Sequence, residues 1–419
     1  MNWTTTRLRY VADLNPGIRA DLLQAPDVEV SFLPMDAIGE DGTLDLSRNR
    51  AVAEVRNGYS YFEEGDVAFA KVTPCFENGK GALMRGLEFG AGFGTTEITV
   101  LRPKEGTEPR FLNYVLRSEQ FRQNGVGAMT GAGGLKRVPD DFTRDFKTPW
   151  PTPDEQERIA NFLDEQTARI DALIAEKQQL QNRLGEYRRS LISSAITQGV
   201  PGKHKELVQH ESLGMVPKGW VVGKFRHYVQ VRSGQVDPED SAYANLVLIA
   251  PNHIESGTGR LISTESAAEQ AAESGKYWCD AGDVIYSKIR PALRKATLAP
   301  LDCLCSADMY PLKGLAPLSN EYLYWYLLSE PFSDFAVQES MRVAMPKLNR
   351  ETLADAAIPL PSPAEQAEIV AFVKRTTAAV DDLTLHVTEH IDLLCEYRSS
   401  LISAAVTGQL DLSTFKAVA

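Results

Sequence analysis

The densest group of basic side chains in the sequence lies between Lys288 and Lys295. It holds four positive charges and no acidic residue, at Lys288, Arg290, Arg294 and Lys295. The group follows a Gly-Asp turn and is interrupted by Pro291, which is typical of a strand that leads into an exposed loop. Arginine and lysine in such a loop can bind DNA phosphates or donate to the two major-groove acceptors of guanine. A solvated loop without a ligand is the alternative.

A matching segment lies in the N-terminal half of the chain. Residues 65–74 follow residues 282–291 in their order of glycine, aspartate, apolar strand and lysine. We predict a second DNA contact here, with the same alternative of a solvated loop. Its candidate residues are Lys71, Thr73, Asn78 and Lys80.

Two further candidate contacts precede two long helical segments. Residues 130–137 read Thr-Gly-Ala-Gly-Gly-Leu-Lys-Arg, so backbone amides there could approach a phosphate closely. We predict contacts by Lys136 and Arg137, and a flexible linker is the alternative. In the corresponding place of the second half the candidates are Arg342, Lys347 and Arg350.

Motifs for catalysis are missing from the sequence. We find no Asn/Asp-Pro-Pro-aromatic motif for methylating a flipped base and no Gly-x-Gly fingerprint, and the Gly-Lys pairs at Lys80 and Lys276 lack the hydroxyl residue of a phosphate loop. The five cysteines are scattered and form no complete zinc site. His386 and His390 have metal-binding spacing on a helix, but we interpret His390 as a helix-interface residue. We therefore expect a protein without catalytic residues, metal or cofactor.

Composition limits the classes of function. A chain of 419 residues, 43% apolar and 24% charged, suggests two or three folded domains. The absence of a signal segment and of a long apolar run predicts a cytoplasmic protein with no membrane partner. The net charge of −12 argues against binding nucleic acid through bulk charge. DNA binding then requires basic residues gathered on one face, or phosphate contacts supplied by a partner.

Two long helices are the elements that would position the candidate residues. The first begins after Thr152, which can cap it, with proline at the first helical position and glutamate at the third. It ends at the glycine after Gln198. Apolar residues recur at alternating steps of four and three, which indicates a coiled coil. The predicted seam is Ile159, Leu163, Ile170, Leu173, Leu180, Leu184, Tyr187 and Leu191.

The second helix repeats the first 210 residues later. Ser362 and Pro363 correspond to Thr152 and Pro153, and both helices end in a Tyr-Arg…Ser-Leu-Ile-Ser sequence. Unrelated helices would not share such ends by chance, so the chain is an internal duplication. The second seam is predicted at Ile369, Val373, Val380, Leu383, Val387, Leu394, Tyr397 and Leu401.

The repeated helix ends hold more apolar residues than a two-helix seam needs. We predict that this surplus face binds a partner protein, in the manner of a helix in a groove. Burial against the chain's own domains is the alternative. The residues concerned are Tyr187, Leu191, Ile192, Ala195, Tyr397, Leu401, Ile402 and Ala405.

The order of segments predicts an α+β fold. Two similar mixed α/β domains are expected at 1–150 and 203–360, long helices at 151–200 and 361–409, and a tail at 410–419. The second domain can join the two helices comfortably only if its ends lie close together. We therefore expect the helices to pair antiparallel, with a pseudo-two-fold relation between the two halves.

This pattern resembles the specificity subunits of type I restriction-modification systems over the whole chain. The resemblance rests on the Pro-x-Glu-Gln helix starts at Pro153 and Pro363, the two matching helix ends, and the Gly-Asp-Val-x-x-x-Lys segments before Lys71 and Lys288. It implies two target-recognition domains, each reading one half of a bipartite asymmetric DNA site, and helices that fix the gap between the halves.

The resemblance also implies partners. Methyltransferase subunits, usually two, would dock on the spacer helices and methylate adenine, and a restriction subunit would supply ATP-driven translocation and cleavage. This chain would be the non-catalytic member that binds double-stranded DNA. A coiled-coil scaffold or adaptor whose two domains bind proteins is the alternative, which the acidic net charge leaves open.

Overall fold

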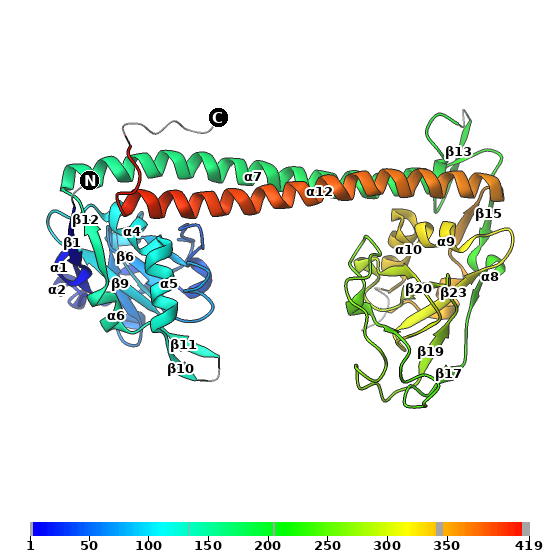
Figure 1. The fold of residues 1–419 in the computed structure, drawn as a ribbon, viewed down its shortest axis with the longest axis horizontal. Coiled ribbons are helices and arrows are strands. Elements are labelled where there is room, and N and C mark those ends of the chain that lie inside the picture. Colours follow the sequence, from blue (N-terminus) through cyan, green and yellow to red (C-terminus); the bar gives the residue numbers. More distant parts are fainter. Residues whose placement is uncertain (1–2, 133, 204–205, 341–346, 413–419) are drawn as a thin grey trace. The chain divides into compact units, whose positions relative to one another are not determined.

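The computed structural model describes residues 3–132, 134–203, 206–340 and 347–412. The chain divides into two compact units (Figure 1). Unit 1 comprises Met1–Gln178 and Glu389–Ala419, and unit 2 comprises Gln179–Thr388. Each unit holds an α/β part, called its body below, and a segment of each long helix. Within the described ranges, no helix combines the length and apolar character needed to cross a membrane.

The body of unit 1 contains twelve strands and short helices between them. The strands are β1 (Thr4–Arg7), β2 (Ala12–Leu14), β3 (Glu29–Leu33), β4 (Asn49–Ala51), β5 (Ser60–Glu63), β6 (Val67–Ala70), β7 (Gly81–Leu83), β8 (Ala91–Gly94), β9 (Ile98–Pro103), β10 (Thr130–Ala132), β11 (Leu135–Arg137) and β12 (Lys147–Trp150). The helices are α1 (Leu8–Val11), α2 (Ala20–Leu23), η1 (Met35–Ala37), α3 (Val52–Val55), η2 (Glu88–Gly90), α4 (Pro109–Arg117), α5 (Glu119–Ala128) and α6 (Asp140–Asp145).

Two four-stranded sheets form the centre of this body. The first has the order β2-β9-β6-β7 and is antiparallel. The second has the order β4-β3-β8-β5, and β3 and β8 are its parallel pair. Strand β6 is apolar and fully buried, and α4 packs on β6 and β7. The pair β1-β12 and the hairpin β10-β11 complete the body.

Unit 2 has a body of the same kind. Its strands are β13 (Leu207–His210), β14 (Gly214–Pro217), β15 (Val221–Lys224), β16 (Val229–Val231), β17 (Gln235–Val236), β18 (Leu248–Ile249), β19 (Lys276–Cys279), β20 (Val284–Ser287), β21 (Ala296–Leu298), β22 (Cys303–Cys305), β23 (Met309–Gly314) and β24 (Ala357–Leu360). Its helices are α8 (Phe225–Tyr228), η3 (Pro251–His253), η4 (Pro291–Leu293), α9 (Asn320–Leu328), α10 (Glu330–Ser340) and α11 (Arg350–Ala354).

One sheet of unit 2 repeats the order found in unit 1, and the other has its parallel pair at an edge and not in the centre. The order β16-β23-β20-β21 corresponds to β2-β9-β6-β7, and the pair β15-β24 corresponds to β1-β12. The second sheet, β17-β19-β22-β18, again has one parallel pair, β18 with β22. The predicted α+β fold with two similar mixed domains and two long helices is confirmed.

The long helices are α7 (Pro153–Gln198) and α12 (Pro363–Val406). A buried glutamine explains the Pro-x-Glu-Gln sequence at both starts. Gln156 accepts a hydrogen bond from the backbone N of Glu108 at 2.9 Å and donates to the carbonyl of Pro151 at 3.0 Å. Gln366 does the same with Ser319 and Pro361, at 2.9 and 3.0 Å. Each glutamine therefore ties the start of its helix to the segment that precedes α4 or α9.

The helix segments of unit 2 run antiparallel. Gln181 donates to Thr388 at 2.8 Å, and Arg188, seven residues further along α7, donates to Asp381, seven residues earlier in α12. In unit 1 Arg398 lies 2.8 Å from Asp171, the same kind of pair with the roles of the two helices exchanged. The antiparallel pairing predicted from the chain order is therefore present.

The register of the seam differs from the predicted one. Positions Leu163, Ile170, Leu184 and Leu191 face inward as expected. Every second predicted position is replaced by the residue that follows it in the sequence. The side chains turned inward at these positions are Thr167, Ile174, Gln181 and Arg188 on α7 and Thr377, Thr384, Ile391 and Arg398 on α12. The predicted seam residues Leu173, Leu180, Tyr187, Leu383 and Tyr397 are exposed instead.

Partners for the polar seam residues account for this register. Gln181 and Arg188 bond to Thr388 and Asp381, so turning them inward leaves no unpaired charge. The same shift leaves His390 exposed on α12. Its interpretation as a helix-interface histidine is wrong.

Candidate nucleic-acid interface

The candidate residues after β6 are mostly held by their own unit. Lys80 donates to the carbonyl of Met35 at 3.1 Å, and Asn78 donates to Glu40 at 2.9 Å. The hydroxyl of Thr73 lies at the base of the β10-β11 hairpin, where it donates to a backbone carbonyl at 2.9 Å and accepts a backbone N–H at 3.0 Å. Lys71 is half-buried at the end of β6. These side chains therefore mainly hold the loop in its conformation, and most of their hydrogen-bonding groups are already used within the unit.

The hairpin carries the other two candidates of unit 1. Arg137 makes a two-pronged ion pair with Glu97, at 2.8 and 2.7 Å. Hydrogen bonds from Arg137 hold the pKa of the Glu97 carboxyl below its usual value, because they stabilise its charged form. Lys136 is exposed on the opposite face of β11. Of this pair, Lys136 is the free cation and Arg137 is an anchor.

The basic cluster of unit 2 is partly buried. Lys288 lies 5.3 Å from the ring centroid of Tyr310 and bonds to the carbonyl of Ala307. Burial, followed by the nearby charge of Lys347, lowers the pKa of Lys288. Lys295 donates to the carbonyl of Pro251 at 2.6 Å.

Two arginines of this cluster have left-handed backbone conformations, with φ near 48°. Arg294 donates to the hydroxyl of Ser333 at 2.9 Å, and burial lowers its pKa. Arg290 is exposed at the start of η4. Arg290 is thus the member of the cluster best placed to meet a ligand.

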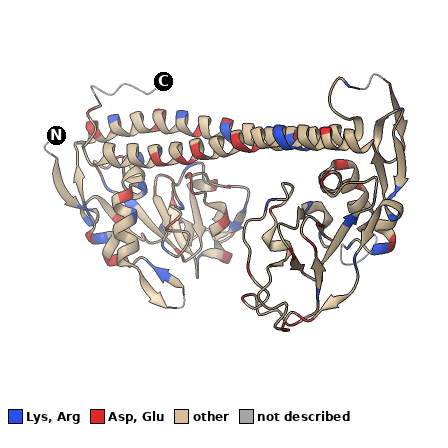
Figure 2. Cartoon of the chain, turned by 45° about the vertical axis from the view of Figure 1, so that its right-hand side comes forward, with Lys and Arg blue, Asp and Glu red and all other residues tan. Residues whose placement is uncertain are grey.

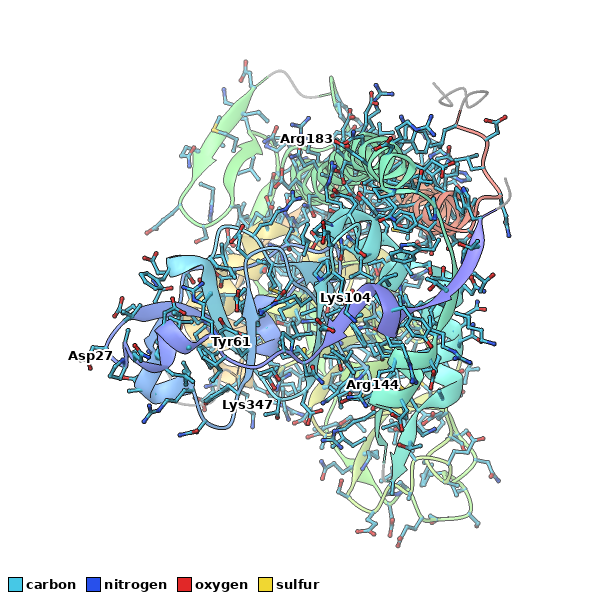
Figure 3. The ribbon with its side chains drawn as sticks, turned by 90° about the vertical axis from the view of Figure 1, so that its left-hand side faces the viewer. Asp27, Tyr61, Lys104, Arg144, Arg183 and Lys347 are labelled. Atoms are coloured by element: carbon cyan, nitrogen blue, oxygen red, sulfur yellow. The ribbon has the colours of Figure 1, made fainter. Side chains whose placement is uncertain are left out.

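Residues after α10 join this cluster. Lys347, labelled in Figure 3, is exposed and forms a β-bridge with Ile289. Arg350 stacks over Tyr277 and Tyr310, at 5.9 and 5.5 Å from the ring centroids. Arg342 lies outside the described residues. The structure therefore brings Lys288 and Arg350 together over Tyr310, with the charge of Lys347 near Lys288.

No motif in the sequence pointed to the aromatic rings in this cluster. Tyr277 lies on β19 and Tyr310 on β23, which belong to different sheets. Only the fold brings them beside Arg350, a cation–π arrangement that holds the guanidinium in place. Leu135 on β11 was also missed, although it is 50% exposed on the hairpin.

Most of the predicted partner-binding residues are internal to their units. Leu191, Ile192 and Ala195 belong to the main core of unit 2. Leu401, Ile402 and Ala405 belong to the core that joins body and helices in unit 1. These six side chains pack against the chain's own bodies. Tyr187 and Tyr397 are the two members left exposed, at 56% and 38%.

In each unit an exposed tyrosine occupies the same helical position as exposed leucines. Each of these residues comes directly before an inward-facing seam residue, as Tyr187 comes before Arg188. We call this apolar set the outer flank. It consists of Leu173 and Tyr397 in unit 1 and of Leu180, Tyr187 and Leu383 in unit 2.

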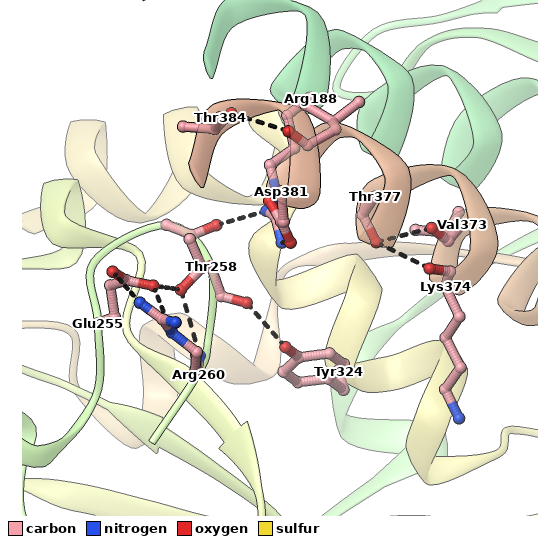
Figure 4. A network of polar contacts seen from close by, with 12 residues as sticks. Arg188, Glu255, Thr258, Arg260, Tyr324, Val373, Lys374, Thr377, Asp381 and Thr384 are labelled. Atoms are coloured by element: carbon pink, nitrogen blue, oxygen red, sulfur yellow. Dashed lines mark hydrogen bonds and ion pairs between the residues drawn. The ribbon is translucent and has the colours of Figure 1, made fainter. Parts of the chain in front are cut away.

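A polar network fastens the body of unit 2 to its helix segments (Figure 4). Arg188 donates to both carboxylate oxygens of Asp381, at 2.8 and 3.3 Å, and to the carbonyl of Gly257 at 3.1 Å. Tyr324 donates to the carbonyl of Thr258 at 3.0 Å, and burial raises the pKa of Tyr324 to about 12. The loop after η3 is thus attached to α7, α9 and, through the ion pair, α12.

Comparison with known proteins finds relatives of one family. Residues 217–392 match the model of the type I restriction modification DNA specificity domain. The chain is 29% identical over 318 residues to the type I restriction enzyme EcoDI specificity subunit of Escherichia coli, covering 72% of this chain and 70% of that protein. Over most of its length the chain is thus similar to the type I restriction-modification specificity subunits. Members of this family are non-catalytic, as expected for this chain.

Other specificity subunits agree with this assignment. The EcoAI specificity subunit of Escherichia coli is 39% identical over 160 residues, which are 38% of this chain and 26% of that protein. A chain solved in a study of complex assembly and conformational transition of the type I R-M system has a TM-score of 0.73 and 20% identity, covering 97% of this chain and 98% of that chain. The HsdS subunit from Thermoanaerobacter tengcongensis has a TM-score of 0.54 and 20% identity, with 97% of each chain covered. These two likenesses concern the fold.

Proposed function

We propose that this specificity subunit recognises a bipartite, asymmetric site in double-stranded DNA. The domain at 1–150 would read one half-site and the domain at 203–360 the other, while the helices at 151–200 and 361–409 set the gap. The observation that carries the proposal is the repetition of one sheet order in two bodies whose loops differ. One scaffold with two different loop surfaces suits two different half-sites.

Local charge supports the DNA contact despite the net charge of −12. In unit 2 the cluster of Lys288, Lys347 and Arg350 lies beside the exposed Arg290. In unit 1 the hairpin carries the blue of Lys and Arg on β11 and none of the red of Asp and Glu (Figure 2). We assign phosphate and base contacts to the exposed Arg290, Lys347 and Lys136. The candidates bonded within their units, such as Lys80 and Lys295, would instead hold the loops in shape.

The partners we propose are methyltransferase subunits, two per chain, and restriction subunits in the full complex. The duplication supports the number two, because the outer flank occurs once in each unit. Exposed apolar and aromatic side chains on a helix surface suit an amphipathic partner helix. Docking would then use the outer flank, since the other predicted partner-binding residues near the helix ends are packed in the cores of their own units.

A substitution on the outer flank tests the docking site. Tyr187→Glu combined with Tyr397→Glu places two charges in the proposed contact and leaves both cores untouched. We expect the methyltransferase subunit to be lost from the co-purified complex. Arg183→Glu is the matched control, because Arg183 is exposed elsewhere on α7 (Figure 3). Full retention of the methyltransferase by the double variant would place docking elsewhere.

Selection from a random duplex library tests DNA recognition. The chain, purified with its methyltransferase subunit, should enrich duplexes with two specified sequences separated by a constant number of unspecified base pairs. Failure to enrich any sequence, with a stable complex, would favour the protein scaffold, which the acidic net charge fits better.

A further inference from the structure

The hairpin β10-β11 protrudes from the body of unit 1 (Figure 1). Every described residue of both strands is exposed. Figure 1 shows the two strands extending away from the sheets of this unit. Strand β10 consists of threonine, glycine and alanine, whereas β11 carries leucine, lysine and arginine. The ribbon is therefore narrow, with nearly all its side-chain bulk on one strand.

The base of the hairpin is fixed on the body. Thr73 exchanges backbone and hydroxyl hydrogen bonds with Lys136, at 3.0 Å each, and its hydroxyl also donates to Gly134 at 2.9 Å. A β-bridge joins Val72 to Arg137, and Arg137 is clamped by its ion pair to the Glu97 carboxylate. Several bonds thus orient a segment that has no packed core around it. Such pre-ordering lowers the entropy lost on binding.

Glycine is required for this ribbon at two positions. Gly131 has φ +143°, and a Cβ there would lie 2.4 Å from the carbonyl oxygen of Leu135 on the facing strand. Gly134 has φ +81°, in the left-handed region that favours glycine. Gly131 therefore permits the close approach of the two strands, and Gly134 permits the left-handed backbone that leads into β11.

Two side chains of the hairpin are free for a ligand. Lys136 is exposed and makes no side-chain hydrogen bond or ion pair to any described residue, and Leu135 is 50% exposed on the other face of β11. No acidic residue occurs between Met129 and Val138. The strand β11 thus combines a cation, an apolar group and local positive charge.

We propose that this hairpin enters the major groove of DNA and reads bases of the half-site assigned to unit 1. The inference rests on the proposed function. The major groove admits a two-stranded β-ribbon. Lys136 would donate to guanine O6 or N7, and Leu135 would contact a thymine methyl group. Arg137 acts as a positioning residue, because its guanidinium is committed to Glu97.

Contact with phosphates alone is the closest competitor. A phosphate contact weakens binding equally for all sequences, whereas a base contact changes the preference at particular positions. The hairpin geometry favours bases, because an exposed leucine gains nothing from a phosphate. The counterpart in unit 2 falls on residues 341–346, outside the described residues, so the inference concerns unit 1.

The test uses the complex with the methyltransferase subunit and the site selected for the wild-type chain. Lys136→Ala and Leu135→Ala are compared by their affinity for duplexes mutated singly through both half-sites. We expect each variant to lose about 5- to 150-fold of discrimination at one or two adjacent positions of one half-site, the range of a good base contact. Discrimination in the other half-site should not change.

Lys147→Ala is the matched control, since Lys147 is an exposed lysine on β12 of the same unit. Unchanged discrimination in both hairpin variants would overturn the inference, as would a uniform loss across all sequences. An unchanged melting temperature verifies that the variants are folded. If the wild-type complex selects no site at all, the proposed function fails before the hairpin is tested.

Discussion

Arg188→Ala should detach the loop after η3 from the helix pair of unit 2. The Arg188 side chain is 9% exposed and makes hydrogen bonds to Asp381 and to the carbonyl of Gly257. Its removal leaves both groups without their cation. Asp381 is 48% exposed and can be hydrated again. The carbonyl of Gly257 can replace its lost hydrogen bond only with water that reaches it.

The magnitude follows from this difference in exposure. Breaking a fully buried ion pair costs about 3–5 kcal/mol. Because Asp381 is half exposed, we expect about 2–3 kcal/mol of lost unfolding free energy. For a unit of this size the melting temperature should fall by about 5–10 °C. Arg398→Ala, which breaks the equivalent pair with Asp171 in unit 1, should cost less, about 1–2 kcal/mol, since we find no described loop carbonyl bound by Arg398.

Thermal unfolding and hydrogen exchange measure the effect. Exchange should increase in peptides covering residues 255–260, because the loop loses its bond to α7. Arg189→Ala serves as the control, as Arg189 is the exposed neighbour on the same helix. If Arg188→Ala lowers the melting temperature no more than Arg189→Ala and leaves loop exchange unchanged, the network does not fasten the loop.

Three further substitutions probe other contacts. Glu97 has a lowered pKa in the folded protein, so its pair with Arg137 contributes stability above about pH 4.3. This stability is lost as the pH falls through the folded pKa. Urea unfolding should show Glu97→Gln about 0.5–1 kcal/mol less stable than wild type at pH 7 and equal to wild type at low pH. Tyr322→Phe removes a buried hydrogen bond of 3.0 Å to the carbonyl of Ile196 and should cost about 1–2 kcal/mol in the same assay, and no loss would mean that water replaces the hydroxyl. Gly131→Ala should distort the hairpin, so site selection should relax in one half-site while the melting temperature stays within a few degrees; unchanged selection would contradict its role.

The sequence predicted the long helices because their signals are local. A capping threonine, a proline and a seven-residue period act within one helix and need no knowledge of the rest of the chain. The buried Gln156 and Gln366 are part of that same start sequence. The repeat then implied two similar bodies and an antiparallel pair.

The seam register could not be predicted in the same way. Leu173 and Ile174 are both apolar neighbours, and either can face the partner helix. The choice is made by the body and by long-range bonds, such as that of Arg188 to Asp381, which periodicity does not contain. Apolar residues on the outer flank therefore looked like seam residues.

The candidate contacts were predicted from side-chain type and from their place in expected loops, and neither reveals a bonding partner within the chain. Lys80, Lys288 and Lys295 each reach a backbone carbonyl that lies far away in the sequence. Such acceptors carry no sequence signal, because every residue has a carbonyl group. The exposed Arg290 and Lys136 could be separated from them only with the fold in hand.

The central claim is that one chain reads two half-sites held at a fixed gap. Mapping N6-methyladenine in the genome of a host that expresses this chain with its methyltransferase subunit tests it most directly. The account predicts a single bipartite motif with a constant number of unspecified bases between its halves. A continuous motif, or no motif in the presence of a stable complex, would contradict it.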